Sequence, residues 1–117
     1  IDHIFDTTCC ADEVSRPKPC PEMGKKVLSR LDADPNRCLM LGDSVCDIEM
    51  ARNNRIESCA VGWGATPIEC LLEASPNIAI TDFFQLLDIL GIAKTSSEFL
   101  SIFPSKPTGI SETLPTC

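Results

Sequence analysis

The sequence is poor in positive charge. Its 117 residues contain 10 Lys and Arg against 17 Asp and Glu, so the formal net charge is −7 at pH 7. Nucleic acids and anionic membrane surfaces attract proteins through clusters of basic residues. The charge balance therefore argues against nucleic acid and against a membrane surface as partners.

Long hydrophobic runs are also absent from the sequence. A membrane-spanning helix needs about 20 consecutive apolar residues, and no run approaches that length. The first 13 positions include Asp2, Asp6, Asp12 and Glu13, where a signal peptide would have a basic start and an apolar centre. We therefore expect no membrane span and no signal peptide. The chain begins with Ile1 rather than Met, so residue 1 need not be a biological start.

The sequence has no C-x-x-C pair and a single histidine, His3, although it contains eight cysteines. A zinc site formed by Cys9, Cys10 and Cys20 would lack the usual spacing of zinc ligands. A secreted disulfide scaffold would lack a clear pattern of strands and helices, which this chain has. Cys59 lies in an apolar segment, where a free thiol behaves as a small hydrophobic group. We therefore expect reduced structural cysteines and a cytoplasmic location.

Short apolar segments alternate with helical patterns along residues 1–93. Strands are predicted at residues 4–8, 38–41, 58–61 and 77–80, and helices are predicted to begin near residues 21, 44, 66 and 82. Strands joined through helices by short connections are typical of a parallel sheet covered by helices, so we predict an α/β domain. Residues 94–117 are rich in Ser, Thr and Pro, and we predict a mostly disordered tail there.

Residues 39–48, which read L-M-L-G-D-S-V-C-D-I, are the most informative stretch. The predicted strand breaks at Gly42, so Asp43 lies at its carboxyl end, where open α/β sheets bind their ligands. If a helix begins near Ser44, Asp43 and Asp47 lie one turn apart, where two carboxylates repel unless a cation lies between them. Oxygen ligands beside a tight turn suit a hard cation such as Mg²⁺. The alternative is that Asp43 is a helix N-cap.

A second motif lies upstream, where residues 16–21 read R-P-K-P-C-P. Lys18 in its K-P-C-P setting resembles the third motif of the haloacid dehalogenase superfamily. Residues 42–48, followed by A-R-N at residues 51–53, resemble the fourth motif, in matching order and separation. The resemblance covers residues 1–90 and is strongest to the phosphoglycolate phosphatase-like subgroup. It implies a partial Rossmann-like parallel sheet of the haloacid dehalogenase type.

The resemblance also implies a function, a Mg²⁺-dependent phosphatase that acts on a small phosphorylated metabolite through an aspartyl-phosphate. By position, Lys18 would contact the phosphate and the nucleophile. Asp43 would bind Mg²⁺ directly, and Asp47 would support the metal shell or bind through water. Ser44 would support the site. The alternatives are a solvated loop cation for Lys18 and compensation of the helix dipole for Asp47.

The D-x-D-x-T motif that carries the nucleophile in this family does not occur in the 117 residues. Residues 32–34 read D-A-D, but they follow a predicted helix rather than a strand. The family's sheet order, 3-2-1-4-5, would make residues 4–8 the third strand and residues 38–41 the fourth. Two strands would then be missing between them, which leaves apolar sheet edges unpaired. The sequence therefore resembles the C-terminal part of a longer phosphatase, and we expect it to show no turnover by itself.

Two other interpretations remain open from the sequence. The chain could be a non-catalytic binding or regulatory module that keeps the cation site without the nucleophile. It could also be an unrelated α/β domain in which Lys18 and Asp43 have only turn and capping roles. The turn at residues 62–64, which reads G-W-G, would line the mouth of a pocket or serve only as a structural turn.

Overall fold

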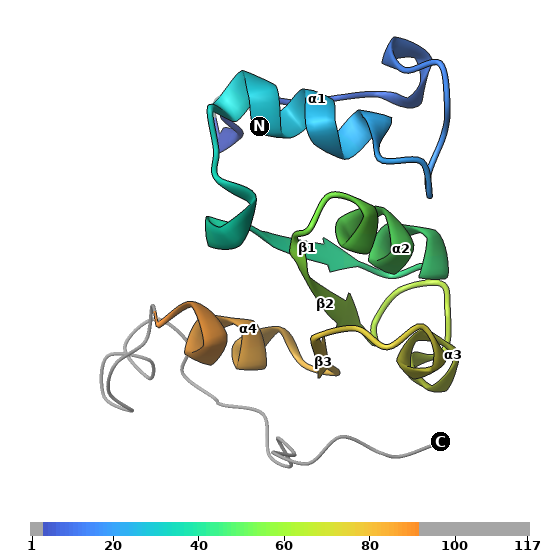
Figure 1. The fold of residues 1–117 in the computed structure, drawn as a ribbon. Coiled ribbons are helices and arrows are strands. Elements are labelled where there is room, and N and C mark those ends of the chain that lie inside the picture. The colour runs from blue at the N-terminus through green and yellow to red at the C-terminus, as the bar shows by residue number, and fades with distance from the viewer. Residues whose placement is uncertain (1–3, 92–117) are drawn as a thin grey trace.

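The computed structural model describes residues 4–91; residues 1–3 and 92–117, which include the predicted tail, lie outside the described part (Figure 1). Its elements, in chain order, are the 3₁₀ turn η2 (Ala11–Glu13), α1 (Glu22–Leu31), the 3₁₀ turn η3 (Pro35–Arg37), β1 (Leu39–Gly42), α2 (Val45–Asn53), β2 (Glu57–Val61), α3 (Ile68–Glu73), β3 (Ile78–Ile80) and α4 (Phe83–Leu90). None of the helices in residues 4–91 combines the length and the apolar character that crossing a membrane requires.

The strands form one parallel sheet in the order β1-β2-β3. Leu41 of β1 lies opposite Cys59 of β2, and Ala60 of β2 lies opposite Ala79 of β3. Each crossover contains a helix, as a parallel sheet requires. The predicted α/β class with a parallel sheet and flanking helices is therefore confirmed.

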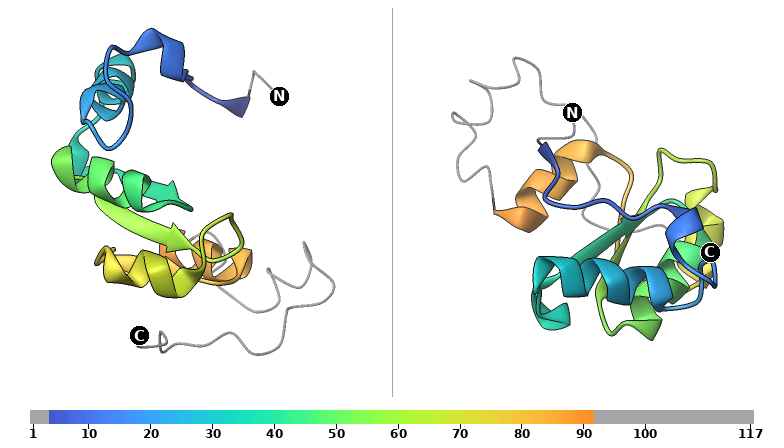
Figure 2. Two further views of the ribbon diagram at one scale, coloured as in Figure 1. Left: turned by 90° about the vertical axis from the view of Figure 1, so that its right-hand side faces the viewer. Right: turned by 90° about the horizontal axis from the view of Figure 1, so that it is seen from above.

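Helices cover both faces of this sheet. On one face Ile48 of α2 and Leu71 of α3, both fully buried, pack against Ala60 of β2. On the other face Leu86 of α4 packs against Cys59 of β2. Consecutive β2 residues therefore point to opposite layers, which is the period-2 alternation of a strand. Figure 2 shows α2 and α3 on one side of the strands and α4 on the other.

Helix α1 lies beyond the β1 edge of the sheet (Figure 1). An apolar groove of about 440 Å³ separates it from β1 and α2. The groove is lined mainly by Met23, Val27, Leu28, Leu31, Leu39 and Met50. A hydrogen bond from Asn53 Nδ2 to the Pro19 carbonyl (3.0 Å) joins the segment before α1 to the end of α2.

The predicted strand at residues 4–8 is wrong. This segment has irregular backbone, with Ile4 68% and Phe5 57% exposed. It runs beside α1, where the Arg30 guanidinium donates a hydrogen bond to the Thr8 carbonyl. A strand needs a neighbouring strand to satisfy its main-chain hydrogen bonds, and within residues 4–91 none lies beside this segment. The apolar, β-branched pattern alone was therefore insufficient to make a strand.

Candidate functional site

The candidate site lies at the carboxyl edge of the sheet. Strand β1 ends at Gly42 and is followed by Asp43 and Ser44, while the G-W-G turn at residues 62–64 follows β2. Because β1 and β2 are parallel, the segments after them meet at the same edge. Lys18 arrives from the loop before α1.

Helix α2 begins directly behind this edge because Ser44 caps it. The Ser44 hydroxyl oxygen accepts a hydrogen bond from the Asp47 main-chain N–H (3.2 Å). A cap of this kind contributes about 1 kcal/mol to helix stability. Since Ser44 is the N-cap, the alternative role of Asp43 as the cap is wrong, and its carboxylate is left for other contacts.

Asp47 and Lys18 form an ion pair. Lys18 Nζ lies 2.5 Å from Asp47 Oδ1, and the Ser44 hydroxyl donates to Asp47 Oδ2 over 2.9 Å. The Asp47 side chain is 7% exposed and the Lys18 side chain 38%. Gly42 makes room for this carboxylate, because a Cβ added there would lie 2.3 Å from Asp47 Cβ. Lys18 is therefore not a free cation in a solvated loop. Asp47 does more than compensate the dipole of α2, because it also binds Lys18.

Lys18 reaches Asp47 from a turn. The Cys20 N–H donates to the Pro17 carbonyl (3.0 Å), and the Lys18–Pro19 peptide bond is cis. This arrangement is a turn with a cis proline at its third position. The two prolines that flank Lys18 would by themselves favour an extended backbone, and the sequence does not reveal the cis bond of this turn.

The surroundings of Asp47 set its charge. Burial by itself raises the pKa of this carboxyl, but the hydrogen bonds and positive charge of Lys18, together with the Ser44 contacts, outweigh burial and hold the pKa below its ordinary value. Asp47 is therefore an anion at neutral pH, and its two oxygens are already engaged by Lys18 and Ser44.

Asp43 is engaged on one oxygen only. Its half-buried carboxylate accepts a hydrogen bond at Oδ2 from the main-chain N–H of Ala65 (3.3 Å), in the turn after β2. Within residues 4–91 the other oxygen, Oδ1, has no hydrogen-bond or ion-pair partner. A carboxylate oxygen without a partner at the ligand-binding edge of the sheet is suited to a cation.

These donors fit Mg²⁺ rather than a metal that needs a complete cage of protein ligands. In the part of the chain that the structure describes, Asp43 and Asp47 have no third Asp, Glu, Cys or His close enough to complete a set of three ligands. Mg²⁺ is usually held by one or two carboxylates and completes its octahedron with water and substrate phosphate. Asp43 Oδ1 fits a direct ligand, and Asp47 fits a supporting position.

Another cluster of possible metal ligands lies elsewhere, in η2 and at the residue before it. Ligand atoms of Cys10, Asp12 and Glu13 lie within 4.8 Å of one another, and all three residues are exposed. The Glu13 carboxylate is already bound by the Cys10 main-chain N–H (2.6 Å) and by Arg30 (2.7 Å). In the sequence this group is visible only as the C-A-D-E run at residues 10–13, which does not by itself indicate a metal site.

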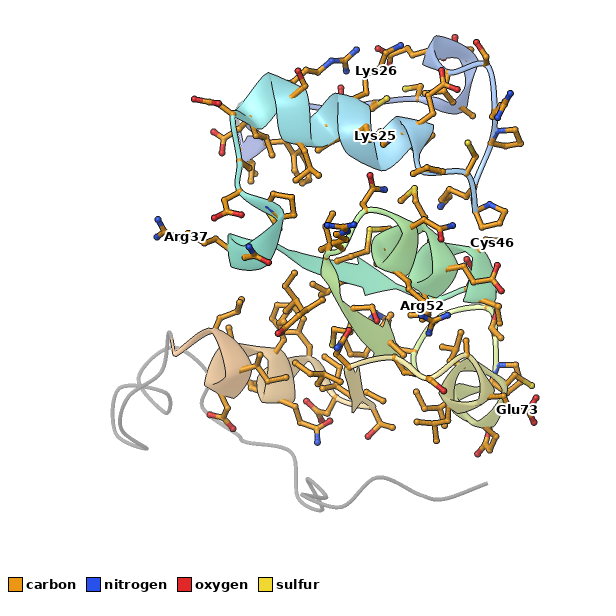
Figure 3. The ribbon with its side chains drawn as sticks, viewed as in Figure 1. Lys25, Lys26, Arg37, Cys46, Arg52 and Glu73 are labelled. Carbon is orange, nitrogen blue, oxygen red and sulfur yellow. The ribbon has the colours of Figure 1, made fainter. Side chains whose placement is uncertain are left out.

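Two other basic side chains, Arg52 and Arg37, lie away from the site carboxylates. Arg52 of α2 donates to the carbonyls of Ala74 and Ser75 at the end of α3 (Figure 3). Arg37 precedes β1 and so lies at the opposite end of the strand from Asp43 (Figure 3). Over residues 4–91, Lys18 is the basic side chain that contacts either site carboxylate.

An exposed aromatic pair adjoins the site. The rings of Trp63 and Phe83 meet edge to face, with centroids 6.3 Å apart, and the two residues are 49% and 52% exposed. They follow the carboxyl ends of β2 and β3, so the G-W-G turn is tied to the start of α4. The helical pattern of α4 places Phe83 in line with the apolar residues Leu86, Leu87 and Leu90, so the sequence alone does not indicate this contact.

The sequence matches a family model. The model is described as "Haloacid dehalogenase-like hydrolase" and matches residues 1–61, which include Lys18, Asp43 and Asp47. That is more than half of the chain.

Individual relatives agree with this match. Pyrophosphatase PpaX of Bacillus velezensis is 33% identical over 92 residues, which cover 79% of this chain and 43% of the relative. A protein of Dickeya dadantii named "Probable phosphatase IndB" is 36% identical over 83 residues, which cover 71% of this chain and 36% of the relative. The crystal structure of a hydrolase from Pseudomonas syringae superposes with a TM-score of 0.62 at 27% identity, over 69% of this chain and 37% of that one. The chain thus spans about two fifths of the length of the relatives that it matches.

Proposed function

The chain belongs to the haloacid dehalogenase-like hydrolase family, and on this premise we propose that it is part of a Mg²⁺-dependent phosphatase. The proposed substrate is a small phosphorylated metabolite, hydrolysed through an aspartyl-phosphate. The relatives named as pyrophosphatase and phosphatase support phosphoric ester or anhydride hydrolysis as the reaction class. Phosphoglycolate, from the subgroup resemblance, and pyrophosphate, from the relatives' names, are the substrates to test first.

One observation carries the proposal: Lys18 and the two carboxylates of a distant segment, residues 43–47, lie at the ligand-binding edge of the sheet. Lys18 lies 2.5 Å from Asp47, and the Asp43 carboxylate is held on one oxygen while the other lacks a partner in residues 4–91. Phosphoryl transfer asks a protein chiefly for positioning and for positive charge around the phosphate oxygens. The arrangement supplies both.

Each residue has a proposed role. Asp43 is the direct Mg²⁺ ligand, and Asp47 supports the metal shell and holds Lys18 in place through the short ion pair. Lys18 binds a phosphate oxygen and reduces the repulsion between the phosphate and this acidic chain. Ser44 orients Asp47 through its hydroxyl. When bound, Mg²⁺ would neutralise negative charge on the phosphate and orient it.

The nucleophile is proposed to come from residues outside these 117, because the sequence contains no D-x-D-x-T motif. Its carboxylate would attack phosphorus, the P–O bond to the leaving group would break, and water would then hydrolyse the aspartyl-phosphate to inorganic phosphate. We also propose a cytoplasmic location, which the free cysteines among the described residues support.

The absence of that motif also favours a second candidate, a non-catalytic phosphatase-like module. Such a module would bind Mg²⁺ and phosphate through Lys18 and Asp43 without turnover. The two candidates share the same site and differ only in the presence of a nucleophile.

The test is to read the coding transcript upstream of Ile1 and to assay the protein that it encodes with phosphoglycolate and pyrophosphate. The phosphatase proposal expects a D-x-D-x-T motif after an apolar strand, and Mg²⁺-dependent hydrolysis that Asp43→Asn lowers about 100-fold or more, because a preorganised electrostatic contact contributes on that order. The exposed Glu73→Gln is the matched control and should leave turnover unchanged. A start codon at or near Ile1 would favour the binding module, and turnover unaffected by Asp43→Asn would contradict the site.

A further inference from the structure

We propose that Gly64 is a positioning residue for the Asp43 carboxylate. Without a side chain at position 64, the turn between β2 and α3 can close against Asp43, and this contact determines which carboxylate oxygen is left for a cation. The contact itself is independent of the reaction, whereas its consequence for Mg²⁺ rests on the proposed function.

The approach of the two residues is too close for any side chain at position 64. A Cβ added to Gly64 would lie 2.2 Å from Asp43 Cβ, 2.7 Å from Cγ and 2.4 Å from Oδ2. Carbon atoms that are not bonded to each other prefer separations of about 3.5–4.0 Å. A substitution would therefore have to move either the turn or the Asp43 side chain.

Backbone conformation does not explain the glycine. Within residues 4–91, Gly91 is the glycine with a left-handed backbone, at φ 67°, and Gly64 does not adopt this conformation. Gly64 is also exposed, so it is not required by core packing. The close approach to Asp43 is the feature that requires the absence of a Cβ.

The close approach of the turn places a main-chain hydrogen-bond donor beside the Asp43 carboxylate. Ala65 follows Gly64 directly, and its main-chain N–H donates to Asp43 Oδ2 (3.3 Å). This bond occupies Oδ2, which leaves Oδ1 for the cation. Outer-shell hydrogen bonds of this kind orient metal ligands. Gly64 thus acts on the metal site through Asp43 without touching the metal.

Gly62 provides a matched control in the same turn. A Cβ added there would lie 3.2 Å from Thr81 Cγ2 and 3.4 Å from the Ile80 carbonyl oxygen, and its nearest contacts include no atom of Asp43. Gly62→Ala therefore adds the same methyl group to the same turn without crowding the carboxylate.

The first test is a double-mutant cycle in the 117-residue chain without metal. Gly64→Ala should raise the unfolding equilibrium constant about tenfold, the order expected for overpacking. In the Asp43→Gly background, where every contacting side-chain atom is gone, the same substitution should change it less than about twofold, since the two effects are coupled through contact. An equal effect in both backgrounds would overturn the proposal.

The second test measures Mg²⁺ affinity by calorimetric titration of variants that keep the wild-type far-UV spectrum. Gly64→Ala should weaken Mg²⁺ binding about 10–100-fold, and Gly62→Ala by less than about twofold. Unchanged affinity in Gly64→Ala would overturn the proposed positioning role. If the unsubstituted chain fails to bind Mg²⁺, the proposed function fails instead, and the metal-free cycle still decides whether position 64 holds Asp43 in place.

Discussion

At the scale of single residues, the site depends on the hydrogen-bond and ion-pair partners of one buried carboxylate, that of Asp47. Asp47 is held by Lys18 on one oxygen and by Ser44 on the other. A buried charge that loses its partner is costly, because its desolvation is no longer offset. The ion pair is therefore both a structural contact and the means by which Lys18 is held at the sheet edge.

Replacing Lys18 with Met should lower the free energy of unfolding by about 1–3 kcal/mol at pH 7, the cost of leaving a buried acceptor with a missing partner. Methionine keeps much of the apolar stem and removes the charge. Lys25→Met is the control, because Lys25 is exposed on α1, and it should change stability by less than about 0.5 kcal/mol. Urea denaturation measures both variants, and equal losses would contradict the ion pair.

Acid should remove the contribution of Asp47 to stability. Since Lys18 and Ser44 hold its folded pKa below the ordinary value of 3.8, the ionised pair contributes fully above that value. The contribution is lost as the pH falls through the lower folded pKa, because the unfolded chain then binds a proton more readily than the folded one. Asp47→Asn should therefore flatten the pH dependence of unfolding below about pH 4.

Some acid sensitivity should remain in Asp47→Asn. Main-chain N–H groups of Cys10 and Ser15 lower the pKa values of Glu13 and Glu22 in the folded chain, respectively. Denaturation curves from pH 2 to 7 would separate the contributions, and an unchanged slope in Asp47→Asn would rule out its depressed pKa.

At the scale of elements, the contact between the start of α1 and the end of α2 positions the turn that carries Lys18. Gly24 of α1 lies so close to Asn54 that a Cβ there would be 2.2 Å from the Asn54 Nδ2 atom. Asn54 is buried, and its Nδ2 donates to the Met50 carbonyl (2.9 Å), so it cannot move freely. The close approach holds the start of α1 near α2.

Gly24→Ala should reduce stability by about 1 kcal/mol net, because overpacking of about 1–3 kcal/mol exceeds the helix-propensity gain of about 1 kcal/mol. Ser29→Ala, at an exposed position of the same helix, isolates propensity and should stabilise slightly. Thermal unfolding compares the two variants. A Gly24→Ala chain more stable than wild type would show that α1 does not need this approach.

Elements were predictable from the sequence where their signals are local. Helix α4, predicted to begin near residue 82, is an example: Asp82 accepts from the Phe84 N–H (2.8 Å), and Gly91 ends the helix in a left-handed conformation. Asp before a helical pattern and Gly after it are signals that the local sequence carries. The predicted strand at residues 4–8 failed because strand formation depends on a partner elsewhere in the chain. The turn at Lys18 was missed because the pattern does not reveal a cis bond.

The candidate site was predictable from the sequence only where its residues belong to a local motif. Asp43, Ser44 and Asp47 come from one short motif, and the resemblance brought in Lys18. The contacts of Gly64 and Ala65 with Asp43 join turns after two different strands. They depend on the distance between those turns in the fold, which no local pattern specifies.

At the scale of the whole molecule, an acidic chain concentrates one lysine and two carboxylates at the carboxyl edge of its sheet. With a net charge of −7, the chain repels a phosphate unless local positive charge attracts it. Lys18 and a cation at Asp43 would provide that charge. The exposed cluster of Cys10, Asp12 and Glu13, at the start of η2, is the competing place for a divalent cation among the described residues.

The most direct measurement is an amide NMR titration of the 117-residue chain with Mn²⁺, a paramagnetic substitute for Mg²⁺ that accepts the same oxygen ligands. The proposed site predicts that resonances of residues 42–47 and of Gly64 and Ala65 broaden first, that Mg²⁺ reverses the effect, and that Asp43→Asn removes it. Broadening that centres on residues 10–13 and is unchanged in Asp43→Asn would contradict the proposed metal site.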